Sequence, residues 1–135
     1  MMDYAQRMEA FAAECGLPPP DTAAGAVVID FDGIAVSFID NAPAGAILLH
    51  AGIGEALGGT AGAVAGDMLA ANSALREKPG TILCQDPETK EFAAIRPIPL
   101  LAAEPGVLAE AAGDLVKTVV SWRERIGAGG RGQGL

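Results

Sequence analysis

The chain has 135 residues, enough for one domain with a continuous hydrophobic core. Nine Lys and Arg against seventeen Asp and Glu give a net charge of -8, which would repel a phosphate backbone and argues against a nucleic acid as partner. The unbroken apolar runs are far shorter than the roughly 18 to 20 residues of a membrane span, and the N-terminus lacks the basic and apolar stretches of a secretory signal, so we expect a cytoplasmic protein without membrane insertion.

The first predicted element is an amphipathic helix over residues 4–15. Its apolar stripe recurs at spacings of four, three and four: Tyr4, Met8, Phe11 and Cys15. Gly16 is predicted to end the helix. The segment that follows, "LPPPDTAAG", is predicted to be an extended linker, because three consecutive prolines exclude a helix and cannot donate to a sheet.

Residues 26–51 are predicted to form three consecutive strands. The first two, "AVVIDF" and "IAVSFID", flank Asp32-Gly33, a dipeptide that tolerates the positive φ of a type I′ turn. Alternation gives each of these strands one main apolar face, made of Val27, Ile29 and Phe31 in the first and Ile34, Val36 and Phe38 in the second. The turn "NAPAG" then leads to a third strand, "AILLHA".

A glycine-rich loop and a second helix follow these strands. The loop, "GIGEALGG", superficially offers the Gly-x-Gly pattern of a dinucleotide site, but it lacks the Lys and Ser/Thr of a P-loop, and the chain next forms a hairpin instead of a parallel strand. A flexible turn is therefore the preferred interpretation. Thr60 is predicted to cap a helix over 61–75 with this apolar stripe: Val64, Met68, Ala71 and Leu75.

A second hairpin and a long helix complete the chain. The strands "TILCQ" and "EFAAIRPI" flank the turn "DPETK", and Pro97 and Pro99 are predicted to end the second strand or to place it at a sheet edge. The last helix is predicted from Glu104-Pro105 to about Ile126, with an apolar stripe of Leu108, Ala112, Leu115, Val119, Trp122 and Ile126. Residues 128–135 have the composition of a flexible glycine-rich tail.

The predicted order is therefore α-β-β-β-α-β-β-α. Neighbouring strands joined by short turns indicate a mostly antiparallel, twisted five-stranded sheet with three helices packed on it, an α+β fold. Residues 1–127 are predicted to form this single domain.

Asp30 and Asp32 raise an enzymatic alternative. An apolar strand that ends in Asp-x-Asp-Gly is typical of haloacid-dehalogenase-type phosphatases, in which the first Asp is the nucleophile and the second a general acid/base. Here Gly33 is followed by Ile34, and the chain returns at once as an antiparallel strand. We therefore prefer a hairpin turn, and a small Asp-based phosphatase remains the less favoured alternative.

The other candidate chemical groups do not form a coherent catalytic set. His50 is the only histidine and lies on a predicted strand, and no nucleophile-elbow motif surrounds a Ser or Cys. Cys15 and Cys84 lack metal-ligand spacing and are interpreted as buried free thiols. We therefore expect a binding protein with no enzymatic activity, no metal and no cofactor.

The chain as a whole resembles the class I type III secretion chaperones, the Tir-chaperone (CesT-like) family. The similarity is spread over about residues 4–126. "CGLPPP" resembles the end of that family's first helix, and "DMLAANSA" resembles its central helix. "TILCQDPETKEFAAIRPIPL" is similar to its fourth and fifth strands, and "VVSWRERI" to the end of its last helix.

This resemblance implies a homodimer that binds the N-terminal region of a secreted effector and keeps it unfolded and secretion-competent without ATP. A regulatory or adaptor domain of the same fold, acting outside secretion, is the alternative. The family places its dimer interface at the central helix and later strands, which makes Val64, Met68 and Leu69 candidates, unless they are ordinary core residues.

Three apolar residues are candidates for effector contact because they face away from the main apolar sets of their strands: Val28, Ile39 and Leu48. If one sheet face is buried beneath the helices, these side chains form an apolar patch on the other, and such patches mark partner sites. The alternative is that the protein's own helices cover both faces.

Overall fold

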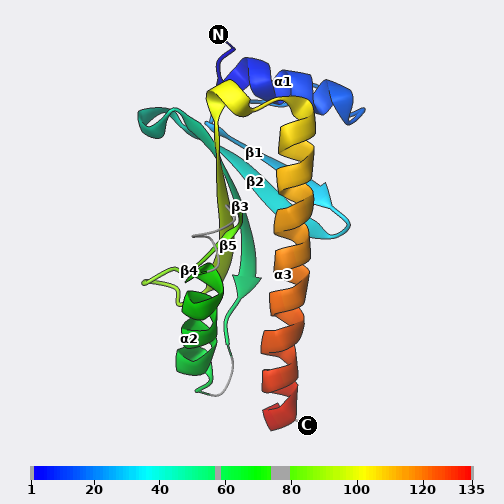
Figure 1. Ribbon diagram of the computed structural model, residues 1–135. Helices are drawn as coiled ribbons and strands as arrows, with labels where there is room; N and C mark the ends of the chain where they lie inside the picture. Colours follow the sequence, from blue (N-terminus) through cyan, green and yellow to red (C-terminus); the bar gives the residue numbers. More distant parts are fainter. Residues whose placement is uncertain (1, 57–58, 74–79, 135) are drawn as a thin grey trace.

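The computed structural model describes residues 2–56, 59–73 and 80–134, with side chains described as far as residue 127 (Figure 1). The elements follow the predicted order, with two short 3-10 helices in addition: α1 (Tyr4–Glu14), β1 (Ala26–Phe31), β2 (Ile34–Asn41), η1 (Ala42–Ala44), β3 (Ala46–Gly54), α2 (Ala61–Asn72), β4 (Ile82–Gln85), β5 (Phe92–Pro99), η3 (Leu100–Ala102) and α3 (Pro105–Gly134).

The five strands form one sheet in the order β1-β2-β3-β5-β4, and every neighbouring pair is antiparallel. The predicted α+β fold is therefore confirmed. β1 is one edge of the sheet and β4 the other, while β5 lies between β3 and β4 for part of its length.

Asp32-Gly33 forms the predicted turn between β1 and β2. Both residues have positive φ, 53° and 87°, as a type I′ turn requires. Asp30 also belongs to this turn, because its Oδ1 accepts a hydrogen bond of 2.8 Å from the Gly33 N–H. The two carboxylates are therefore parts of a hairpin.

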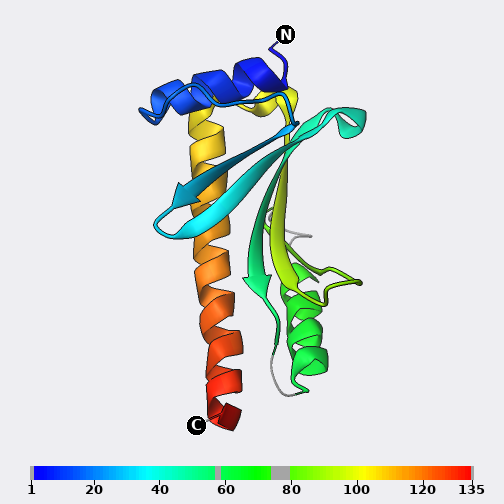
Figure 2. The same ribbon diagram turned by 180° about the vertical axis from the view of Figure 1, so that it is seen from behind.

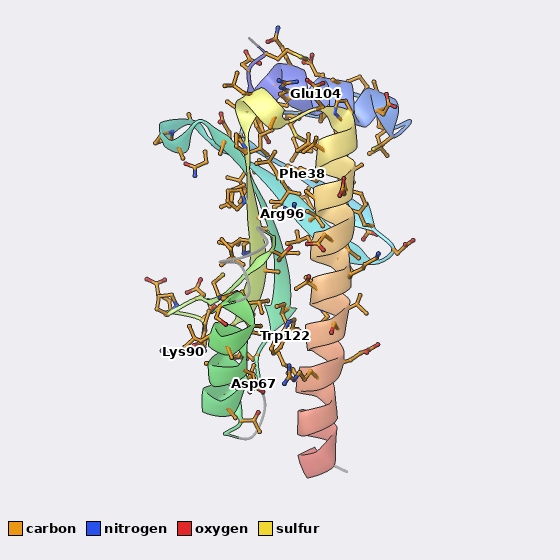
Figure 3. The ribbon with its side chains drawn as sticks, in the orientation of Figure 1. Phe38, Asp67, Lys90, Arg96, Glu104 and Trp122 are labelled. Atoms are coloured by element: carbon orange, nitrogen blue, oxygen red, sulfur yellow. The ribbon has the colours of Figure 1, made fainter. Side chains whose placement is uncertain are left out.

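The helices cover one face of the sheet. α3 runs along β3 and β5, and α1 crosses the end of α3 near its first turns (Figure 1). The predicted apolar stripe of α3 is confirmed, because all six of its residues are buried. The predicted face of the first hairpin meets them, with Phe38 and Trp122 in the space between sheet and helix (Figure 3).

α1 is stabilised by a cap at its N-terminus and by an aromatic contact near its C-terminus. Asp3 and Gln6 form a capping box at its start, each side chain accepting from the other residue's N–H at 2.9 Å. Phe11 packs against Phe38 with ring centroids 5.2 Å apart. The prediction that Cys15 is buried is wrong, because the helix ends at Glu14 and Cys15 is an exposed capping residue.

Arg7 is a buried charged residue on α1. Its guanidinium donates to the carbonyl oxygens of Leu100 and Leu101 at 3.0 and 3.4 Å and forms an ion pair of 3.2 Å with Glu104. These bonds join α1 to the connection between β5 and α3, where Glu104 lies beside α1 (Figure 3). Two donors of this planar group thereby reach main-chain carbonyls, and a third reaches the Glu104 carboxylate.

Several element boundaries differ from the predictions. β3 continues through Gly54 with an irregularity between Gly52 and Gly54, so the first part of the predicted glycine loop is strand. The described part of α2 ends at Asn72, and Leu75 lies outside the described residues; Ala71, predicted on the apolar stripe, is exposed. α3 reaches Gly134 instead of ending near Ile126, since glycines weaken a helix without excluding it. Flexibility of residues 128–135 and the boundary at 127 stay predictions.

Candidate functional site

The sheet face opposite the helices carries the three predicted contact residues. Val28 is 64% exposed, and Ile39 and Leu48 are half-buried. Ile39 and Leu48 are direct cross-strand partners, and Val28 pairs with Ser37 on the same face. Seen from behind, β1 and β2 pass in front of α3 (Figure 2). Among the described residues, no helix packs over this face, which differs from the alternative of a sheet covered on both sides.

The edge strand β1 presents main-chain groups that β2 does not use. The Asp40 N–H donates to the Gly25 carbonyl at 2.8 Å, and hydrogen-bonded pairs alternate along an antiparallel ladder. Val27, Ile29 and Phe31 therefore direct their N–H and C=O groups at β2. Ala26, Val28 and Asp30 direct theirs outward, so three residues of β1 offer both a donor and an acceptor at the edge.

A groove of about 500 Å³ runs beside this edge. One wall is β1 from Ala26 to Asp30, and the other is Ala12 at the end of α1 with the linker residues that follow it, Leu17, Pro18, Pro19, Pro20 and Asp21. The prolines have no N–H, so this wall cannot act as a competing strand. Sequence reasoning treated the linker only as a connection and missed its place in the groove.

Leu17 is the one sequence signal that could have indicated this role. It is a large apolar residue that stays 40% exposed and begins a segment that cannot enter the core as regular structure. The groove also has acidic residues at its walls, Asp21 and Asp30. An apolar floor with free main-chain groups and carboxylates at the rim suits an extended peptide better than a small metabolite.

The predicted interface residues lie in different environments on α2. Met68 is buried in the protomer's own core, as the alternative of an ordinary core residue has it, and Val64 is half-buried against that core. Leu69 is 72% exposed. It borders a smaller cavity of about 190 Å³ between α2 and β4. Of the twelve residues of α2, only Met68 is buried, although most of this helix is apolar.

His50 and Cys84, the titratable residues weighed above as candidates for chemistry, lie on different strands, β3 and β4. His50 lies half-buried on the open face between Ser37 and Ile95 of the neighbouring strands. Cys84 is half-buried and not fully buried as predicted, and burial together with Asp86 raises the pKa of its thiol, which makes the thiolate scarcer. Within the described ranges no three or more His, Cys, Asp or Glu residues cluster as metal ligands.

In the part of the chain that the structure describes, no helix combines the length and apolarity needed to cross a bilayer.

Solved structures with the same fold come from protein complexes, and their sequence identity to this chain is low. The chain from the HopA1–SchA chaperone–effector complex is 17% identical, with a TM-score of 0.78 over 90% of this chain and 93% of that one. The chain from the ExsC–ExsE complex is 17% identical, with a TM-score of 0.74 over 91% and 96%. The chain from the ExoU–SpcU complex of the type III secretion system of Pseudomonas aeruginosa is 14% identical, with a TM-score of 0.71 over 87% and 95%.

These three structures share the fold of this chain. A search of curated protein sequences gave no significant match. The model of the Tir chaperone protein (CesT) family matches residues 6–123, which include α2, the whole sheet, the groove beside β1 and most of α1 and α3. The chain therefore belongs to the Tir chaperone protein (CesT) family.

Proposed function

We propose that this protein is a type III secretion chaperone that binds the N-terminal region of a secreted effector and keeps it unfolded. It acts by binding in the cytoplasm, with no chemical step and no ATP. The observation that carries the proposal is the free edge of β1 beside a groove and an uncovered apolar face. Family membership and the shared fold with the SchA and SpcU complexes support it.

The effector segment is held as an added strand. Its main chain pairs with the outward groups of Ala26, Val28 and Asp30, and main-chain pairing is independent of side-chain sequence. Alternate side chains then enter the groove or lie over the apolar face. A segment bound in this way is extended and cannot complete its own fold while it stays paired.

The apolar face adds affinity to this pairing. Val28 joins the edge to the patch, because its main chain belongs to β1 and its exposed side chain lies on the same face as Ile39 and Leu48. Covering such side chains contributes roughly 25 cal/mol for each Å² removed from water. An effector segment with apolar residues at alternate positions is therefore the expected partner.

A capture experiment with two matched variants tests this function. Val28→Asp places a carboxylate in the patch, whereas Val120→Asp makes the same change at a valine of α3 that is 42% exposed on the helix surface. We expect the wild type and Val120→Asp to co-purify with one effector from the native bacterium, and Val28→Asp to lose it. Equal capture by both variants would refute the assignment of the surface, and no polypeptide partner at all would refute the function.

We further propose that two copies associate through α2. A helix that is apolar around most of its circumference yet buries one residue of twelve needs another surface to cover it. Leu69 is the residue most affected, since its side chain is exposed beside the cavity against β4. Of the predicted interface residues, Leu69 is thus the best probe, with Val64 beside it and Met68 supporting it from the core.

Light scattering after size exclusion tests the dimer. Leu69→Asp should shift the wild-type dimer to a monomer. Leu101→Asp is the control, because Leu101 is also a highly exposed leucine, 75%, but lies on η3 at the other end of the sheet. A monomeric wild type, or a Leu69→Asp protein that remains dimeric, would contradict the α2 interface.

A further inference from the structure

The two edges of the sheet differ in what they offer to an incoming strand. β1 has three residues whose N–H and C=O groups point outward, as described above. The opposite edge has two parts: the short strand β4, and the end of β5 that extends beyond β4. Each part is closed in its own way.

Proline closes the exposed part of β5. Ile95 is the last β5 residue that pairs with β4, opposite Ile82, and Pro97 and Pro99 lie beyond that pair. The Leu100 N–H donates to the Gly45 carbonyl at 2.9 Å, so by alternation Pro97 and Pro99 face away from β3. An N–H at these positions would point to the open side, and proline has none. The expectation that these prolines mark an edge is therefore correct locally, although β5 is an interior strand over its first half.

Asn72 occupies the outward groups of β4. The same alternation directs Leu83 away from β5, because Leu83 is opposite Ala94, between the hydrogen-bonded pairs on either side. The Leu83 N–H donates to Asn72 Oδ1 at 2.9 Å, and Asn72 Nδ2 donates to the Leu83 carbonyl at 2.8 Å. One carboxamide thus satisfies both groups of Leu83, as a residue of a neighbouring strand would.

We propose that Asn72 closes the β4 edge and thereby confines strand addition to β1. The proposal rests on the function proposed above, since it specifies which edge receives the effector strand. Asn72 is the last residue of α2, so the helix delivers the carboxamide to the strand at a fixed position. With Leu83 taken and Pro97 and Pro99 lacking donors, Gln85 is the remaining β4 residue that faces outward among those the structure describes.

Closure of the β4 edge prevents the addition of a strand there, which side-chain packing alone does not do. An open edge pairs with any extended chain, including another copy of the effector segment or an unfolded protein. A sheet with one open edge can add one strand, and only at that edge. Asn72 is therefore a specificity-determining residue for a partner that it does not touch.

Removal of the carboxamide tests the proposal with a peptide of known chemistry. The probe is a short synthetic peptide of alternating Val and Thr with a terminal Lys, and native mass spectrometry counts peptides per chain. We expect one peptide on the wild type and two on Asn72→Ala. Asn72→Ser serves if the alanine variant does not fold, as judged by the fluorescence of the single tryptophan.

Two further variants locate the second peptide. Ser73→Ala is the matched control, because its hydroxyl donates to Ala70 within the helix end and does not touch β4, so it should bind one peptide. Asn72→Ala combined with Val28→Pro should also bind one, now at β4, with the Leu83 amide protected from hydrogen exchange by the peptide.

The outcomes separate this inference from the function on which it rests. If Asn72→Ala binds one peptide while its Leu83 amide exchanges faster, the carboxamide only ties α2 to the sheet and the inference is wrong. If the wild type binds none, strand addition at β1 fails. In that case, binding of one peptide to Asn72→Ala with protection of the Leu83 amide would still support closure of the β4 edge by Asn72. Binding of no peptide to Asn72→Ala would overturn the inference.

Discussion

Proline substitutions at two adjacent residues of β1 should have opposite consequences. Val28 directs its N–H outward to the groove, whereas Ile29 directs its N–H at β2, opposite Val36. Proline is tolerated in an edge strand where the missing N–H faces away from the sheet. Val28→Pro should therefore leave the fold intact, and Ile29→Pro should damage it.

The magnitudes follow from the hydrogen bonds lost. Val28→Pro removes the Val28 N–H as a donor to the bound strand and leaves a carbonyl of that strand unpaired, which costs about 1 to 3 kcal/mol of binding, or roughly 5- to 150-fold in Kd. Its effect on the free energy of unfolding should stay within about 1 kcal/mol. Ile29→Pro removes a ladder bond and forces the ring against β2, a loss of about 3 kcal/mol or more.

Urea denaturation and titration with the captured effector segment measure the two effects. The expected pattern is a weakened complex with a normal unfolding midpoint for Val28→Pro, and a lowered midpoint for Ile29→Pro. Equal loss of stability in both variants would show that the alternation assigned to β1 is wrong. Unchanged affinity in a folded Val28→Pro protein would show that the effector does not pair with this edge.

Three further changes probe the core and its polar contacts. Arg7→Ala should lower the free energy of unfolding by about 2 to 4 kcal/mol in urea, since it removes the hydrogen bonds to the Leu100 and Leu101 carbonyls and the ion pair with Glu104; a loss below about 1 kcal/mol would contradict that role. Burial, and to a smaller extent the charge of Asp40, raises the pKa of Tyr4 from 10.0 to about 12. The phenol therefore ionises first in the unfolded chain, and the free energy of unfolding should fall by about 1 to 2 kcal/mol between pH 10 and 12. Tyr4→Phe should remove this fall. Leu115→Ala should cost about 2 to 5 kcal/mol by leaving a cavity under α3, against less than about 0.5 for the exposed Lys117→Ala, and calorimetry distinguishes the two.

Local sequence patterns predicted the helices and strands. The order of the strands in the sheet depends on pairing between distant segments, which local patterns do not predict. The stripe of α3 and the Asp32-Gly33 hairpin depend on neighbours within a few residues, so periodicity and turn chemistry sufficed. The position of β5 between β3 and β4 depends on strand order, which periodicity does not contain. Pro97 was therefore correctly associated with an edge, but which edge could not be derived.

The candidate surface shows the same division. Alternation was enough to place Val28, Ile39 and Leu48 on the face away from the helices. Leu17 and its prolines became part of a groove only because the linker that follows α1 lies opposite β1. The bond between Asn72 and Leu83 spans eleven residues and a change of element, and no sequence rule predicts it.

The attachment of α1 affects how the chain can fold during synthesis. The partners of Arg7 are Leu100, Leu101 and Glu104, and the helix on which α1 rests begins at Pro105. α1 therefore lacks a large part of its docking surface until α3 has been synthesised, although Phe38 of β2, against which Phe11 packs, is available earlier. Isolated helices of this length are marginal in water. Formation of the native domain, and with it of the groove that α1 helps to build, is expected only after α3 has been synthesised.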